Sequence, residues 1–172
     1  MQNVNNIPTE KEIKLNENDF IVSKTDTKGK ITYCNEIFME MASYDEKELL
    51  GINHNIIRHK DMPKVAFKIA WDLISNGKEF FGFVKNMTNK GNYYWVFANI
   101  TPDYNSNGKI IGYTSVRRKA KQSAIDIIFP IYQKLISLEQ TGGMKASEEY
   151  LMDFLDSKGL TYDELILSLQ GV

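Results

Sequence analysis

Three β-rich segments follow one another near the middle of the chain, at about residues 80–87, 93–101 and 110–118. The sequences that connect them, Asn89-Lys90-Gly91-Asn92 and a loop containing Asn107-Gly108, have the composition of turns. Strands joined by such short connections pair side by side in opposite directions, because a parallel pair needs a crossover of about a dozen residues. This region therefore predicts an antiparallel sheet.

Two further strand-like segments, 20–25 and 30–34, flank Asp26-Thr27-Lys28-Gly29 and predict a first hairpin. Helix signals then follow: an N-cap at Asn35, a short helix at 46–50, and a longer helix after Pro63. The order indicates an α+β domain at 19–119. We expect a five-stranded antiparallel sheet with helices inserted on one side and ligand space between the two layers.

The flanking regions have a different character. Residues 1–18 are predicted to cap the domain, and residues 120–172 carry apolar residues at helical spacing. We expect a kink at Pro130, a helix end at Gly142-Gly143, and two further helices with N-caps at Ser147 and Thr161. This α-helical tail needs a surface to cover, which we expect to be a partner protein or a second copy of the chain.

Charge and cysteine content exclude several classes of protein. The 21 basic and 22 acidic residues leave no broad positive field to attract nucleic acid. The lone Cys34 excludes an internal disulfide and a cysteine-rich metal site, and indicates a reducing compartment, the cytoplasm. Apolar runs fall far short of the roughly 20 residues that span a bilayer. We therefore expect the chain to reach the inner membrane only through a partner.

The loop at 55–63 concentrates polar chemistry in the sequence Asn-Ile-Ile-Arg-His-Lys-Asp-Met-Pro. Arg58 could bind a phosphate through two parallel hydrogen bonds, His59 could donate to an oxygen, and Asp61 could orient either one. The alternative is a structural network in which Asp61 caps the following helix and Arg58 is its ion partner. Spacing alone favours this structural interpretation.

Aromatic and amide side chains could form the walls of a ligand site. Phe67 and Trp71 lie on the longer helix, and their rings could stack on a planar heterocycle, although most such rings form the core. Asn86 and Asn99 are amides inside apolar strands, where an unpaired buried amide costs a few kcal/mol. Either a heterocycle such as isoalloxazine or a neighbouring group could pair with Asn86. For Asn99 we favour a neighbouring group.

Enzyme chemistry finds no support in the sequence. It contains no serine or cysteine nucleophile with a paired base, no phosphate-binding glycine loop and no paired catalytic carboxylates. His54 and His59 are five residues apart, which does not bring both to one metal ion on a helix. Either could ligate a haem, but a solvated or packed histidine is the favoured interpretation.

Taken together, the motifs in residues 20–118 resemble those of the PAS domains of bacterial aerotaxis receptors. The resemblance is carried by Asn55–Pro63, by Val84-Lys85-Asn86, and by Gly91-Asn-Tyr-Tyr-Trp-Val-Phe-Ala-Asn99 followed by Thr101-Pro102. The length of the chain and its tail are similar to those of the stand-alone PAS protein of bipartite energy-taxis systems. A PAS fold is therefore expected.

The resemblance also implies a function. Such a protein would bind FAD non-covalently and report redox or energy state to a membrane-bound chemotaxis transducer of the methyl-accepting type, at its HAMP or signalling region. The implied flavin-binding residues are Arg58, His59 and Asp61 in the loop, with Asn35, Phe67, Trp71 and Asn86 around the ring. A cofactor-free adaptor and a haem sensor are the alternatives.

Two positions depart from related patterns. The aerotaxis receptors have a tryptophan at the start of the third strand, where this chain has Phe80, so one stacking contact differs. Light-sensing LOV domains share the pattern Asn86-x-Thr88-x-x-Gly91-x-x-x-Trp95, but His54 replaces the cysteine that forms their flavin adduct. Covalent photochemistry is therefore not expected.

Overall fold

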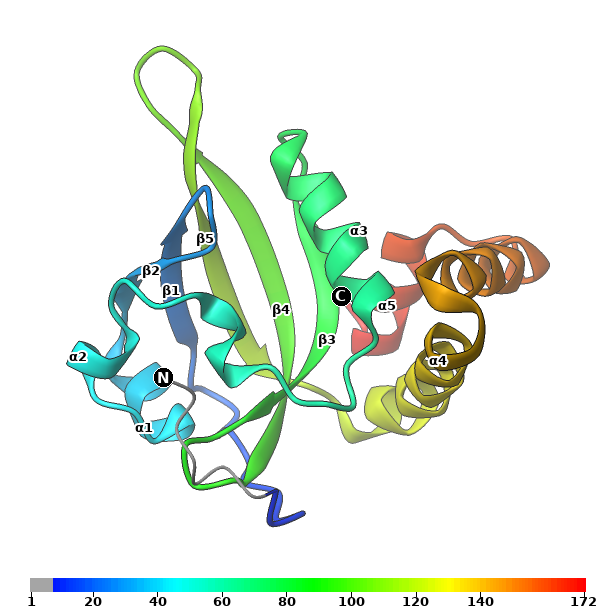
Figure 1. Cartoon of the computed structure of the whole chain (residues 1–172), viewed down its shortest axis with the longest axis horizontal. Helices are drawn as coiled ribbons and strands as arrows, with labels where there is room; N and C mark the ends of the chain where they lie inside the picture. Colours follow the sequence, from blue (N-terminus) through cyan, green and yellow to red (C-terminus); the bar gives the residue numbers. More distant parts are fainter. Residues whose placement is uncertain (1–7) are drawn as a thin grey trace.

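Figure 1 shows the computed structural model of the chain, which describes residues 8–172. Within these residues, five strands form one sheet in the order β2-β1-β5-β4-β3, and all neighbouring strands are antiparallel. The strands are β1 (Ile21–Asp26), β2 (Ile31–Cys34), β3 (Phe80–Met87), β4 (Tyr93–Tyr104) and β5 (Ile110–Lys119). The predicted five-stranded antiparallel sheet is confirmed.

The inserted helices lie between β2 and β3 in the sequence, as predicted. They are α1 (Glu36–Ala42), α2 (Glu46–Leu49), the 3-10 helix η1 (His54–Ile57) and α3 (Lys64–Ser75). The helical tail, residues 120–172, contains α4 (Gln122–Lys158) and α5 (Tyr162–Gln170). In Figure 1, α3 lies along β3 with α4 and α5 beyond it, whereas α1 and α2 lie at the other end of the sheet.

The sheet is apolar on both faces, because side chains along a strand alternate between them. On β4, Tyr94 and Val96 pack in a buried cluster with α1, α2 and the first hairpin. Trp95 and Phe97, the intervening residues, pack in a second buried cluster with the helical tail. The sheet is therefore covered by two separate layers of helices.

The surface that the helical tail covers belongs to the chain itself. Ile128, Leu135, Leu155 and Ile166 are buried with the outer-face residues of β3 and β4. The hydroxyl of Tyr132 donates to the carbonyl of Phe83 in β3 at 2.8 Å. Residues 120–172 thus extend the core of the domain.

The tail helices are divided at Gly143. Its backbone angles, φ 75° and ψ −178°, interrupt the helix as the predicted Gly142-Gly143 stop requires, whereas the helix continues through Pro130. The expected N-cap at Ser147 is wrong, because its hydroxyl instead donates to the carbonyl of Met144 within the helix. Thr161 caps α5 as predicted, in a capping box with Glu164.

Helix α3 is capped by the tail. It begins at Lys64 after Pro63, which supplies no side-chain cap. The backbone N–H groups of Lys64 and Val65 donate instead to the carboxylate of Glu139 in α4, at 3.0 and 2.9 Å. Asp61 does not fill this role. Local sequence could not predict this cap, because Glu139 lies 74 residues after Val65 in the chain.

The predicted cap at residues 1–18 is described from residue 8 onward, and its first seven residues lie outside the described part. Thr9 and Ile13 donate backbone hydrogen bonds to Gly91 and Tyr93, so this segment runs beside the start of β4. Leu15 is buried in the cluster shared with α1. In the described residues, no helix has the length and apolar character needed to cross a membrane.

We predict that Glu139→Ala lowers the free energy of unfolding by about 1–2 kcal/mol, because the charged cap on the α3 N-terminus is lost. The measurement is urea unfolding followed by circular dichroism. Glu149→Ala is the matched control, since Glu149 is exposed and its one ion pair within residues 8–172 is with Lys145 at 3.7 Å. An equal loss in both variants would contradict the capping role.

Candidate functional site

A cavity of about 140 Å³ lies between α3, the loop from Asn53 to Met62, and the inner face of the sheet. Most of its lining is apolar, and the polar groups are few and come from different elements. Sites for small organic ligands in proteins have this composition, with apolar walls and a small number of placed polar groups. The cavity lies in the space predicted between helices and sheet.

Helix α3 supplies the mouth of the cavity through Phe67 and Trp71. The Trp71 ring meets Tyr113 of β5 edge-on at a centroid distance of 5.5 Å, and it is 39% exposed. It also lies against the β1–β2 turn, where a Cβ on Gly29 would come within 3.3 Å of the ring. Trp71 therefore bridges from α3 to the sheet across the opening.

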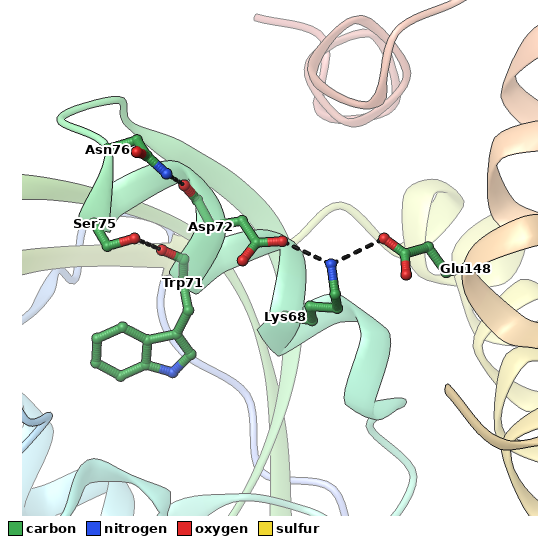
Figure 2. Close-up of polar contacts among 6 residues, drawn as sticks. All are labelled: Lys68, Trp71, Asp72, Ser75, Asn76 and Glu148. Atoms are coloured by element: carbon green, nitrogen blue, oxygen red, sulfur yellow. Dashed lines mark hydrogen bonds and ion pairs between the residues drawn. The ribbon is translucent and has the colours of Figure 1, made fainter. Parts of the chain in front are cut away.

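Figure 2 shows that α3 presents different chemistry on opposite sides. The Trp71 indole points away from α4, whereas the Lys68 ammonium lies between Asp72 and Glu148, at 2.8 and 2.9 Å. Glu148 belongs to α4, so this ion pair joins the cavity-lining helix to the helical tail.

The side chains of the polar loop at residues 55–63 lie on two different sides of the sheet edge. Arg58 lines the cavity, and its guanidinium lies 3.7 Å from the centroid of the Phe67 ring. Its backbone pairs with that of Asn86 in an isolated antiparallel bridge, which fixes the loop against β3. Arg58 is an exposed residue, although partial burial lowers the pKa of its guanidinium.

His59 and Asp61 lie outside the residues that line the cavity. The Asp61 carboxylate pairs with Lys85 Nζ at 2.6 Å, and Lys85 in turn lies over the rings of Tyr93 and Phe129. The backbone N–H of Asp61 donates to Nδ1 of His59, which is 4% exposed. Burial, with the nearby Lys85 charge, lowers the pKa of His59. The contacts of His59 and Asp61 thus fix the conformation of the loop.

Asn35 also lies away from the cavity. Its Oδ1 accepts from the backbone N–H of Phe38, as the predicted N-cap of α1 should, and from that of Val22. Its Nδ2 donates to the carbonyl of Phe20 at 2.8 Å. Asn35 thus joins α1 to β1. Asn99 likewise has neighbouring partners, as favoured, in Glu79 and the carbonyl of Phe80.

Asn86 reaches the cavity and is 3% exposed. Its Nδ2 has no hydrogen-bond partner among residues 8–172. A buried amide donor without a partner costs about 1–3 kcal/mol. The predicted need for a partner is therefore not met within the described residues.

A second polar group at the cavity was missed by the sequence analysis. Arg117 of β5 lines the cavity at 2% exposure, and its Nη2 donates to Ser23 Oγ at 2.7 Å. Its Nε and Nη1 have no partner within the described part of the chain. Burial lowers the pKa of Arg117 to about 10, so it is still charged at neutral pH. Because Arg117 and Arg118 are adjacent and of the same type, the sequence did not show which of them points into the cavity.

His54 completes this end of the cavity. Its Nε2 lies 3.0 Å from Ser23 Oγ, and its ring stacks on Phe38 at a centroid distance of 5.6 Å. Burial first, and then the charge of Arg117, lower the pKa of His54 to about 3. Because Arg117 can only donate to Ser23 Oγ, the serine proton is free for a neutral His54 Nε2.

The arrangement suits a planar ligand that carries hydrogen-bond acceptors at one end. Aromatic rings stand at the mouth, and unpartnered N–H donors of Asn86 and Arg117 stand at the inner end. In the described residues, no group of three or more His, Cys, Asp or Glu side chains could hold a metal ion.

Comparisons with known proteins agree with this geometry. A family model described as "PAS fold" matches residues 31–117, about half of the chain. The aerotaxis receptor of Escherichia coli K12 is 38% identical over 127 residues, which are 74% of this chain and 25% of the receptor. The chain thus spans about a quarter of the length of the curated relatives that it matches.

Solved structures share the fold. A light-oxygen-voltage domain studied with a flavin analogue has a TM-score of 0.57 at 18% identity, over 64% of this chain and 83% of that one. The LOV domain of the Erythrobacter litoralis EL346 histidine kinase has a TM-score of 0.55 at 18% identity, over 60% and 97% of the two chains. The fold and the resemblance inferred from sequence are confirmed, and the chain belongs to the PAS-fold family of sensor domains, with a sequence related to the aerotaxis receptor.

Proposed function

We propose that this PAS domain binds FAD non-covalently in its cavity and reports redox state to a chemotaxis-type transducer. The observation that carries the proposal is the pair of unpartnered donors, Asn86 and Arg117, at the inner end of an otherwise apolar cavity. The carbonyl and ring nitrogen acceptors of an isoalloxazine would satisfy them. The relationship to an aerotaxis receptor, and the fold shared with a domain studied with a flavin analogue, support it.

Four of the predicted site residues line the cavity and would hold the cofactor. Phe67 and Trp71 offer ring faces at the mouth, and Asn86 offers an amide at the inner end. The guanidinium of Arg58, which stacks on Phe67, would bind a phosphate of the cofactor. When bound, FAD supplies reversible acceptance of electrons.

The other three predicted residues would act through their neighbours. Asp61 holds Lys85, and His59 accepts from the Asp61 backbone, so both fix the loop that presents Arg58. Asn35 fixes α1 to β1. We propose that their effect on cofactor binding is one of positioning.

The size of the cavity limits how much of the cofactor it encloses. Its volume of about 140 Å³ is below the roughly 300–1,000 Å³ of typical ligand sites. We expect only the ring end to enter, with α3 moving outward to admit it. Trp71 is 39% exposed and crosses the opening, so its side chain would move first.

Two elements connect the cavity to the helical tail. Helix α3 places Trp71 at the cavity, while its N-terminus is capped by Glu139 of α4. Strand β3 places Asn86 at the cavity, while the adjacent Lys85 lies over Phe129 of α4 on the other face. A change in cavity contacts would therefore displace α4 from both sides.

We predict that the purified protein is yellow, and that Asn86→Leu weakens FAD binding about ten- to a hundredfold while the fold is retained. Binding is measured by quenching of flavin fluorescence. Asn99→Leu, an amide with its own partners on the same sheet, is the control and keeps full affinity.

Three outcomes separate the alternatives. A colourless protein that takes up no added FAD would support the cofactor-free adaptor. A Soret absorption band would support the haem sensor. Equal affinities of Asn86→Leu and Asn99→Leu for FAD would show that Asn86 does not bind the cofactor.

Reduction of bound FAD should change hydrogen exchange in the tail as well as at the cavity. We expect altered protection at residues 64–68 and 122–142, because Glu139 and Lys85 join these segments to the cavity-lining elements. Exchange followed by mass spectrometry, in air and with dithionite, measures it. Changes confined to cavity residues would contradict coupling to the tail.

For the transducer we propose a contact at the exposed face of α4. Ile127 on α4 is 50% exposed. Ile127→Asp should abolish co-purification with the cytoplasmic region of a chemotaxis-type transducer. Ile111→Asp, at a site 53% exposed on β5, is the matched control and should not. If Ile111→Asp abolished co-purification and Ile127→Asp did not, the transducer contact would lie on the sheet and not on α4.

A further inference from the structure

The inner end of the cavity contains a buried positive charge that the fold itself does not balance. Arg117 is 2% exposed, and no carboxylate pairs with it among residues 8–172. Its contacts are the Ser23 hydroxyl at 2.7 Å and the Phe38 ring, whose centroid lies 4.5 Å from the guanidinium carbon. Charged side chains are rarely buried without an ion partner, because desolvation is costly.

The neighbours of Arg117 cannot supply the missing negative charge. His54 is neutral at physiological pH, since burial and Arg117 lower its pKa to about 3. Tyr94 stands near both Arg117 and Asn86, but burial raises its pKa to about 12, so its hydroxyl keeps its proton. Ser23 already accepts from Arg117. A negatively charged occupant of the cavity would therefore supply a balance that the described residues do not.

Two nitrogens of the Arg117 guanidinium are available to an occupant. Nε and Nη1 lack partners among the described residues, and Arg117 is one of the residues lining the cavity. The guanidinium is held on its other side by Ser23 and Phe38, so it is oriented before anything binds. Donors oriented in advance toward a site where charge develops stabilise that charge at little reorganisation cost.

We propose that Arg117 holds the negative charge of the reduced ring in the cavity, and thereby sets the reduction potential of the sensor. This inference rests on the proposed binding of FAD. Reduction of bound FAD by two electrons from a low-potential donor, with one proton from water, would lower the charge of the ring by one unit. The oxidised ring is neutral and gains less from Arg117, so the residue favours the reduced form.

The test compares charge loss on the two faces of the same strand. Arg117→Gln removes the inward charge, and Arg118→Gln removes the adjacent outward one, which lies over Phe97 on the outer face. Both change the net charge of the FAD-loaded chain equally. Arg117→Met is a second neutral variant, which leaves no polar group unpaired. Arg117→Lys keeps the charge.

Reduction potentials are measured by spectroelectrochemical titration of each FAD-loaded protein. We expect Arg117→Gln and Arg117→Met to bind reduced FAD about ten- to a hundredfold less tightly relative to oxidised FAD, a fall in potential of about 30–60 mV. Arg118→Gln should match the parent, and Arg117→Lys should retain most of its potential. The pH at which the neutral, two-proton form of the reduced ring loses a proton to become the anion, read from absorbance, should rise in Arg117→Gln.

The outcomes distinguish this inference from the proposed function. A parent protein that binds no FAD overturns both. A yellow parent whose potential is unchanged in both neutral Arg117 variants, or is lowered as much by Arg118→Gln, overturns the role of Arg117 alone. Folded neutral variants that lose oxidised FAD as well would also overturn it, since Arg117 would then bind both redox forms equally.

Discussion

Strand β4 is buried on both faces, and the two helical layers are arranged around it. Tyr94 and Val96 face one layer of helices, and Trp95 and Phe97 face another. A sheet that is apolar on both sides is stable only when each face is covered. The helical tail supplies the second layer, so it is part of the core and cannot be regarded as a separate appendage.

The two layers of helices also connect the cavity to the helical tail. Helix α3 packs against the tail on one side, through Glu139 at its N-terminus and Glu148 at Lys68, and carries Trp71 on the other. Packed elements of this kind shift as units, because close-packed interiors do not deform continuously. A small change at the cavity therefore has a direct physical connection to the tail, where we propose that the partner binds.

Four of the seven predicted site residues line the cavity. Phe67 and Trp71 follow from helical spacing, and Asn86 from the anomaly of an amide in an apolar strand. Neighbouring residues in an extended loop point in opposite directions, so the composition of the loop could not show that Arg58 faces the cavity while Asp61 faces Lys85. The capping of α3 by Glu139 was equally hidden, since it joins residues that are distant in sequence.

Turn residues, periodicity and family motifs are local properties, so the antiparallel sheet, the positions of the helices and the membership of the PAS family could be predicted from the amino-acid sequence. Which charge is buried at the cavity depends instead on how the strands pair. Arg117 and Arg118 are identical in type, and alternation sends one to each face. The register of β5 beside β1 sets Arg117 opposite Ile21, from where its side chain reaches Ser23, and its Nε and Nη1 have no partner among the described residues. Register arises from pairing across the whole sheet, which no local pattern contains.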